Sequence, residues 1–206
     1  MRKSNSVSNV KNLTLLALMT ALVIVFQCIG LIIPIGFNVG AFALVPIVIG
    51  AAMLGPIAGL WLGAAFGLVV IVTGQASAFY TLVTPQWVGV VVTVAVVLLK
   101  GALAGWISGL IYKMIEKKNS LAAIVTASVV CPVVNTAIFA LASFTVFFPG
   151  ISGWATGARK DMISYIFLTL IGVNFFVELG ICLIFSTVAH RIILIGKKMR
   201  SDKSYI

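Results

Sequence analysis

The charge-free stretch between Lys11 and Lys100 is the feature that most restricts what this chain can fold into. About 20 apolar residues cross the hydrocarbon core of a bilayer, so an uncharged stretch of this length contains several crossings. Hydrophobic residues make up 62% of the 206 residues and charged residues 9%. Soluble domains are about 45–50% apolar and about 25% charged. The composition therefore excludes a soluble or disordered chain and predicts a polytopic membrane protein.

Turn residues and charges divide the chain into six apolar segments. Pro34, the Gly55-Pro56 pair and the polar stretch 74–80 interrupt the first half, and lysines follow Tyr112. Such positions usually end helices or form loops. We predict an all-α membrane protein with a single membrane domain, in which the second helix is the shortest. Its six transmembrane helices are expected over residues 13–33, 39–54, 57–73, 88–112, 121–148 and 163–189, followed by a basic tail over 190–206.

The basic residues predict the orientation. The chain carries 14 Lys and Arg against 4 Asp and Glu, which gives a formal net charge of +10. Most of the basic residues lie before the first helix, between the fourth and fifth helices, and in the tail. Six crossings place these three regions on one side, and the positive-inside rule makes that side, with both termini, cytoplasmic. No basic patch with interleaved aromatic residues is present, so a nucleic-acid partner is not expected.

The chain lacks the motifs of the common catalytic and metal sites. It has no phosphate-binding loop of the Walker type and no HExxH pair, and His190 is its only histidine. Cys28, Cys131 and Cys182 each lie in an apolar run, and none of the pairs has metal-ligand spacing. We therefore expect no enzymatic activity, no metal and no cofactor. Uphill transport would require a separate ATPase.

Four polar residues are predicted to lie deep in the last three helices. Lys100 is about 12 residues, or ~18 Å, into the fourth helix, and Glu178 is about 15 residues, or ~22 Å, into the sixth. Asn174 lies one turn from Glu178 on the same helix face, and Asn135 lies midway along the fifth helix. Ionisable groups at this depth are costly unless they are paired or solvated. The sequence leaves two interpretations open, a structural ion pair and a substrate-binding cluster.

The predicted outer loops carry aromatic and amide side chains and few charges. Aromatic residues at a segment end often anchor a helix at the membrane interface. The alternative is that these side chains capture a small, partly polar molecule from outside. The candidate residues are Asn38, Gln75, Tyr80, Gln86, Trp87 and Trp154.

Small residues recur at intervals of four. Glycines do so from Gly55 to Gly67 in the third helix and from Gly101 to Gly109 in the fourth. Such rows allow close helix packing, and we expect the glycine rows to pack inside the protein. For Ala17 and Ala21 in the first helix, contact with an external partner is an equally good interpretation.

Several of these stretches together resemble one family. The chain is similar to the substrate-binding S component of an energy-coupling factor (ECF) vitamin transporter, over nearly its full length. The stretches that carry the resemblance are Ala17-x-x-x-Ala21, Leu54-Gly55-Pro56-Ile57-Ala58-Gly59, Lys100-Gly101-Ala102-Leu103-Ala104-Gly105, Ile111-Tyr112-Lys113 and Cys131-Pro132-Val133-Val134-Asn135-Thr136.

This resemblance implies a six-helix protein that binds a vitamin from outside in a pocket near its outer face. The pocket is built by helices four to six and the outer loops. The S component docks on a transmembrane coupling protein that carries two cytoplasmic ATPases, and ATP hydrolysis there drives it to tilt and release its vitamin. The family's alanine row contacts the coupling protein, which assigns that role to Ala17 and Ala21.

The chain looks most like the pantothenate-type members. The resemblance then implies that Lys100 binds the carboxylate and that Asn135 and Asn174 bind polar groups. Glu178 departs from this scheme, because it could neutralise Lys100 and repel an anion. Folate, riboflavin or a thiamin precursor remain alternatives. A secondary transporter that needs no partner also remains, although no repeat between the two halves supports it.

Overall fold

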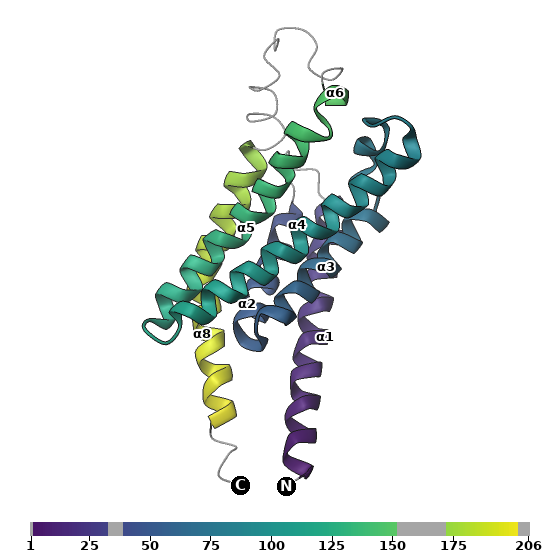
Figure 1. Ribbon diagram of the computed structural model, residues 1–206. Helices are drawn as coiled ribbons and strands as arrows, with labels where there is room; N and C mark the ends of the chain where they lie inside the picture. Colours follow the sequence, from purple (N-terminus) through teal and green to yellow (C-terminus); the bar gives the residue numbers. More distant parts are fainter. Residues whose placement is uncertain (1, 33–38, 152–171, 202–206) are drawn as a thin grey trace.

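The computed structural model describes residues 2–32, 39–151 and 172–201, and the regular structure in these ranges is helical (Figure 1). The predicted all-helical fold is confirmed. Four helices contain spans long and apolar enough to cross a membrane, at Val10–Gly30, Gln86–Ile115, Ser120–Thr145 and Asn174–Ile195. In chain order the elements are α1 (Arg2–Ile32), the 3-10 helix η1 (Val39–Ala43), α2 (Leu44–Leu54), α3 (Pro56–Val72), the 3-10 helix η2 (Ser77–Thr81), α4 (Gln86–Ile115), α5 (Ser120–Thr145), α6 (Phe148–Ile151) and α8 (Val173–Ser201).

The terminal helices are longer than predicted. α1 already begins at Arg2, in the basic stretch that we placed before the first helix, and α8 continues to Ser201, through much of the predicted tail. Basic residues are good helix formers, so a helix can continue past the membrane boundary. Residues 163–171, where the sixth helix was predicted to start, lie outside the described residues.

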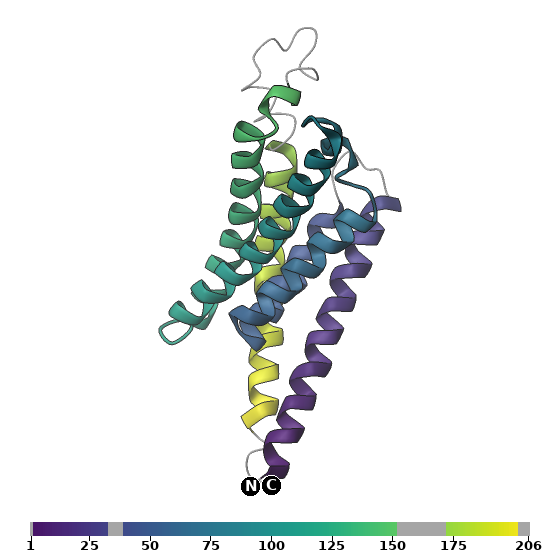
Figure 2. The same ribbon diagram turned by 45° about the vertical axis from the view of Figure 1, so that its right-hand side comes forward.

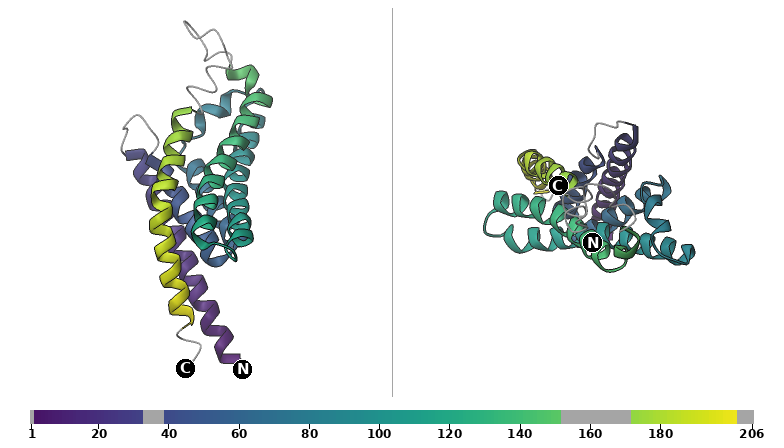
Figure 3. Two further views of the ribbon diagram at one scale, coloured as in Figure 1. Left: turned by 90° about the vertical axis from the view of Figure 1, so that its left-hand side faces the viewer. Right: turned by 90° about the horizontal axis from the view of Figure 1, so that it is seen from above.

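The basic segments gather at one end of the bundle. The start of α1, the turn between α4 and α5 and the end of α8 all lie there, and η2 lies at the opposite end (Figures 1 and 3). This arrangement agrees with the predicted placement of the basic segments on one side. α5 lies beside both α4 and α8, and the short α2 contacts all of α1, α3, α4, α5 and α8 (Figure 2).

The turn between α2 and α3 forms where the sequence predicts it. Gly55 has a φ of 100°, a conformation that side chains disfavour, and Pro56 is the first residue of α3. At the turn before α5, the side chain of Asn119 accepts hydrogen bonds from the backbone N–H groups of Leu121 (2.9 Å) and Ala122 (3.0 Å). These local interactions end one helix and begin the next.

Glycines bring the backbones of α3 and α4 into direct contact. A Cβ atom on Gly59 would collide with the carbonyl oxygen of Gly105, and one on Gly63 would collide with that of Gly101. One on Gly67 would lie 2.8 Å from the carbonyl oxygen of Val97. The prediction that the glycine rows pack inside the protein is confirmed for these three positions. Close backbone approach gives the two helices a long contact without interlocking side chains.

Large apolar side chains cover the outside of the bundle. Ile57 in α3 is 81% exposed, and Phe176 and Ile184 in α8 are 70% and 72% exposed. Apolar exposure on this scale is unusual for a soluble monomer and typical of a surface that meets lipid. The surface therefore agrees with the membrane assignment made from composition.

We predict that Gly63→Ala destabilises the protein, because its Cβ would meet the Gly101 carbonyl of a backbone that cannot move aside. Overpacking of this kind costs about 1–3 kcal/mol or more, which exceeds the helix propensity gained, at most about 1 kcal/mol. The melting temperature of the purified protein in detergent should fall.

Gly180→Ala in α8 is the matched control, because no atom lies within 4 Å of the added Cβ. Its melting temperature should stay unchanged or rise. Equal melting temperatures for the two variants would contradict the role of the α3–α4 contact.

Candidate functional site

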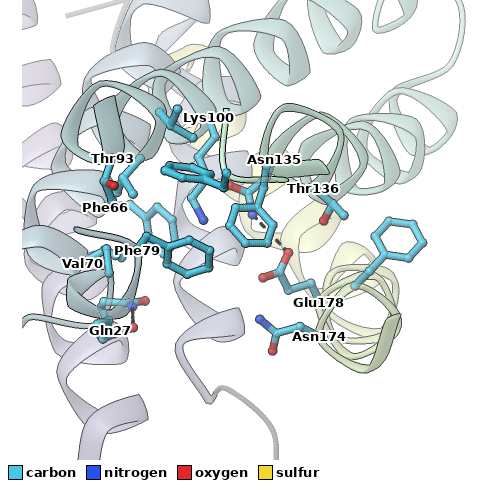
Figure 4. A pocket seen from close by; sticks show the side chains of 17 residues that line it. Gln27, Phe66, Val70, Phe79, Thr93, Lys100, Asn135, Thr136, Asn174 and Glu178 are labelled. Carbon is cyan, nitrogen blue, oxygen red and sulfur yellow. Dashed lines mark hydrogen bonds between the residues drawn. The ribbon is translucent and has the colours of Figure 1, made fainter. Parts of the chain in front are cut away.

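A cavity of about 240 Å³ lies among α1, α3, α4, α5 and α8 (Figure 4). It occupies the half of the bundle near η2, away from the basic end. Lys100 is about 21 Å along α4 from Gln86 by helix rise, so the cavity reaches deep into the bundle. Eight polar side chains line it: Gln27, Gln75, Thr93, Lys100, Asn135, Thr136, Asn174 and Glu178.

The four polar residues predicted in the last three helices come together around this cavity. Asn135 donates a hydrogen bond from Nδ2 to Oε2 of Glu178 at 3.3 Å, and the two side chains are buried. Asn174 lies one helical turn from Glu178 on α8. α5 lies beside both α4 and α8, so residues far apart in the sequence converge around one cavity.

Among the described residues, no salt bridge joins Lys100 to Glu178. The Nζ of Lys100 lies 5.2 Å from the ring centroid of Phe139, a cation–π contact. The ammonium group of Lys100 is therefore available to an anionic group placed between the two helices.

Three buried oxygen atoms on the cavity wall have no hydrogen-bond partner among the described residues. They are Oε1 of Gln27, Oγ1 of Thr93 and Oδ1 of Asn135, on side chains that are 0%, 2% and 3% exposed. Leaving a buried polar group unpaired costs about 1–3 kcal/mol, so native proteins rarely do it without a water or ligand at the site. All three atoms belong to residues that line one cavity, which makes this cavity the candidate site for a hydrogen-bonding molecule.

Aromatic rings form the apolar part of the wall. Phe79, in η2, packs against Phe139 of α5 with ring centroids 5.4 Å apart, and against Phe147 with centroids 5.3 Å apart. η2, which lies in the segment between α3 and α4, therefore covers one side of the cavity. Such a mixture of an apolar wall and a few placed polar groups is typical of small-molecule sites.

The other predicted site residues have different positions. Tyr80 is partly buried against the hydrophobic core, and Trp87 is 70% exposed at the start of α4. Neither lines the cavity, and the exposed Gln86 does not line it either. Asn38 and Trp154 lie outside the described residues. Gln75 does line the cavity, so the loop after α3 supplies one of the expected outer-loop residues.

Gln27 and Thr93 line the cavity but were not predicted as site residues. The resemblance implied a pocket built by helices four to six and the outer loops, whereas Gln27 lies on α1. A glutamine within a charge-free apolar helix was an available signal, because polar groups at membrane depth are usually functional or paired. Thr93 gave no such signal, since threonine can bond to its own helix backbone.

The arrangement is suited to binding and not to metal chemistry. Among the described residues, no group of three or more His, Cys, Asp or Glu side chains could hold a metal ion. Amide, hydroxyl, ammonium and carboxylate groups surround the cavity instead. These groups can orient a small organic molecule that has both hydrogen-bond donors and an acidic end.

Comparison with known families agrees with this description. The chain matches the family described as "ECF transporter, substrate-specific component" over residues 11–193. No curated protein and no solved structure matches it. Members of this family are non-enzymatic, multi-pass proteins of the prokaryotic cell membrane that bind a substrate and associate with the ECF energy-coupling module. The match spans the bundle from α1 to α8, and the chain belongs to the family of ECF transporter substrate-specific components.

Proposed function

We propose that this S component captures pantothenate from outside the cell. It delivers the vitamin inward through a transmembrane coupling protein driven by two cytoplasmic ATPase subunits. The observation that carries the choice of an acidic vitamin is the position of Lys100, a cation that reaches into a deep cavity with no salt bridge among the described residues. A half-buried cation that lines such a cavity is suited to bind the carboxylate of a ligand.

The other polar groups fit the rest of the molecule. Pantothenate carries hydroxyl groups and an amide N–H, and the cavity has acceptor atoms without partners on Gln27 and Asn135. The hydroxyl of Thr93 can donate or accept. In this arrangement Glu178 accepts a hydrogen bond from a ligand hydroxyl, and Lys100 binds the carboxylate at the other end. The two charged side chains then contact different parts of the ligand.

The size of the cavity favours a small vitamin. Its volume of about 240 Å³ lies below the range of about 300–1,000 Å³ typical of drug-sized ligands. Pantothenate is a short chain, whereas folate and riboflavin carry fused rings and are larger. Volume and charge together favour pantothenate over these two alternatives.

The outer face of α1 supports the proposed contact with the coupling protein. Ala17 and Ala21 are both exposed, in a row with Leu13 and Val25, which are 68% and 50% exposed. An open apolar groove of about 490 Å³ lies beside this row and includes Leu13 and Trp61. A row of small side chains lets a partner helix approach closely, so this face is suited to docking within the membrane. We propose six crossings with both termini cytoplasmic.

We predict that the isolated protein binds pantothenate and that Lys100→Ala abolishes binding. The variant removes the only cation that lines the cavity among the described residues. Losing a charge-assisted hydrogen bond in such a site costs about 1.5–3 kcal/mol or more, which corresponds to at least about a tenfold rise in Kd. Thermal-shift measurements over a panel of water-soluble vitamins, followed by titration calorimetry, would test this.

Lys113→Ala is the control, since Lys113 lies on the same helix but is exposed at its end. If Lys100→Ala binds pantothenate with unchanged affinity, Lys100 has a structural role and does not bind the ligand. A wild-type protein that binds no vitamin of the panel would contradict the proposed function.

We predict that the double variant Ala17→Trp, Ala21→Trp keeps its affinity for pantothenate but no longer supports uptake. Two indole rings on the exposed row would block close approach of a partner helix without entering the cavity. Uptake of labelled pantothenate into proteoliposomes that contain the coupling module and ATP measures the effect.

Ala137→Trp, at an exposed position of α5, is the control and should keep uptake. Loss of vitamin binding by the α1 variant would show that the row packs inside the protein. Uptake by the chain alone would favour a secondary transporter.

A further inference from the structure

We infer that Gln27 of α1 is a ligand-binding residue that recognises a hydrogen-bond donor of the ligand on the side of the cavity away from Glu178. This inference rests on the proposed function. It extends the site beyond the helices and loops that the resemblance implies. It also connects the occupied cavity directly to the helix that carries Ala17 and Ala21.

The orientation of the Gln27 amide follows from its hydrogen-bond chain. Thr73 donates its hydroxyl proton to the carbonyl oxygen of Val69 at 2.7 Å, so its oxygen can only accept from Gln75, whose Nε2 lies 3.2 Å away. Gln75 must then present Oε1 to Gln27, and Gln27 must present Nε2, at 2.8 Å. The remaining atom of the Gln27 amide is its Oε1. Each amide has one possible orientation in this chain.

The Oε1 atom of Gln27 is thereby left as an acceptor that the described protein does not satisfy. The side chain is 0% exposed, lines the cavity and stands among apolar neighbours such as Phe66 and Val70. An amide in this position destabilises the empty protein, because a buried acceptor without a donor loses its hydration. A donor that enters with the ligand removes this cost.

The position of Gln27 determines which part of the ligand it contacts. Figure 4 shows Gln27 and Thr93 on one side of the cavity and Glu178 and Asn174 on the other. The hydroxyl of Thr93 can either donate or accept, whereas Oε1 of Gln27 can only accept. Gln27 therefore selects for an O–H or N–H group and disfavours an ether or carbonyl oxygen at the same place.

The proposed ligand contact and the proposed docking row lie on different faces of α1. Ala17 and Ala21 lie on its exposed side, and Gln27 lies on its buried side, six residues beyond Ala21. A ligand that bonds to Gln27 adds a contact to α1 that exists only in the occupied state. In the proposed arrangement, ligand and coupling protein contact different faces of one helix, which lets occupancy change the affinity of docking.

The test combines Gln27→Met with ligand analogues. Methionine keeps the length of the side chain and removes its polar atoms, and Gln86→Met, at an exposed site outside the cavity wall, is the matched control. The probes are pantothenate and analogues in which one hydroxyl at a time is replaced by hydrogen. For wild type and the control, removing the contacted hydroxyl should raise Kd about tenfold. For Gln27→Met, pantothenate should bind about tenfold more weakly, and removing the same hydroxyl should change Kd no further.

Each outcome has a distinct meaning. Equal weakening of all analogues by Gln27→Met would show that the residue acts only through its bond to Gln75, and would overturn the inference. Unchanged affinity for pantothenate would overturn it as well. If wild type does not bind pantothenate, the proposed vitamin fails, and the Gln27→Met and Gln86→Met pair is compared on the vitamin that the panel identifies. The inference is then supported if removing one O–H or N–H donor from that vitamin weakens its binding to Gln86→Met but weakens its binding to Gln27→Met no further. Equal effects of the removed donor on the two variants overturn it.

Discussion

Polar side chains in the membrane-spanning part of this chain need partners inside the protein, because lipid offers no hydrogen bonds. The structure meets this constraint by gathering deep polar groups around one cavity. Asn135 bonds to Glu178, and Gln27 bonds to Gln75. The oxygen atoms that remain unpaired on Gln27, Thr93 and Asn135 belong to the wall of the same cavity. Several of these unmet requirements therefore lie at one cavity, where a water-soluble ligand can supply the partners.

The close contact between α3 and α4 supports this arrangement. Their glycines let the two backbones touch, so α4 is held along much of its length and Lys100 is carried on a well-supported helix. Placement on a rigid helix preserves the geometry of a binding site better than placement on a loop. The segment between α3 and α4, which includes the short η2, contributes Gln75 and Phe79 to the wall.

Much of the fold was predictable from composition and turn residues. The all-helical polytopic fold, the break at Gly55-Pro56 and the internal packing of the glycine rows follow from hydrophobicity, backbone conformation and side-chain size. These are properties of short stretches of sequence. The full length of α1 and α8 was not predictable in this way, because a helix that leaves the membrane loses the hydrophobic signal without losing helix propensity.

The site was predictable in part. The sequence by itself placed Lys100 and Glu178 at similar depth, with Asn135 midway along its helix and Asn174 one turn from Glu178, since these estimates need only helix start and rise. Only the tertiary structure decided that Lys100 and Glu178 face a shared cavity without a salt bridge, and that Gln27 joins them from α1. Those relations depend on the rotation and packing of helices that are distant in the chain, and no local pattern encodes the angle at which one helix presents a side chain to another.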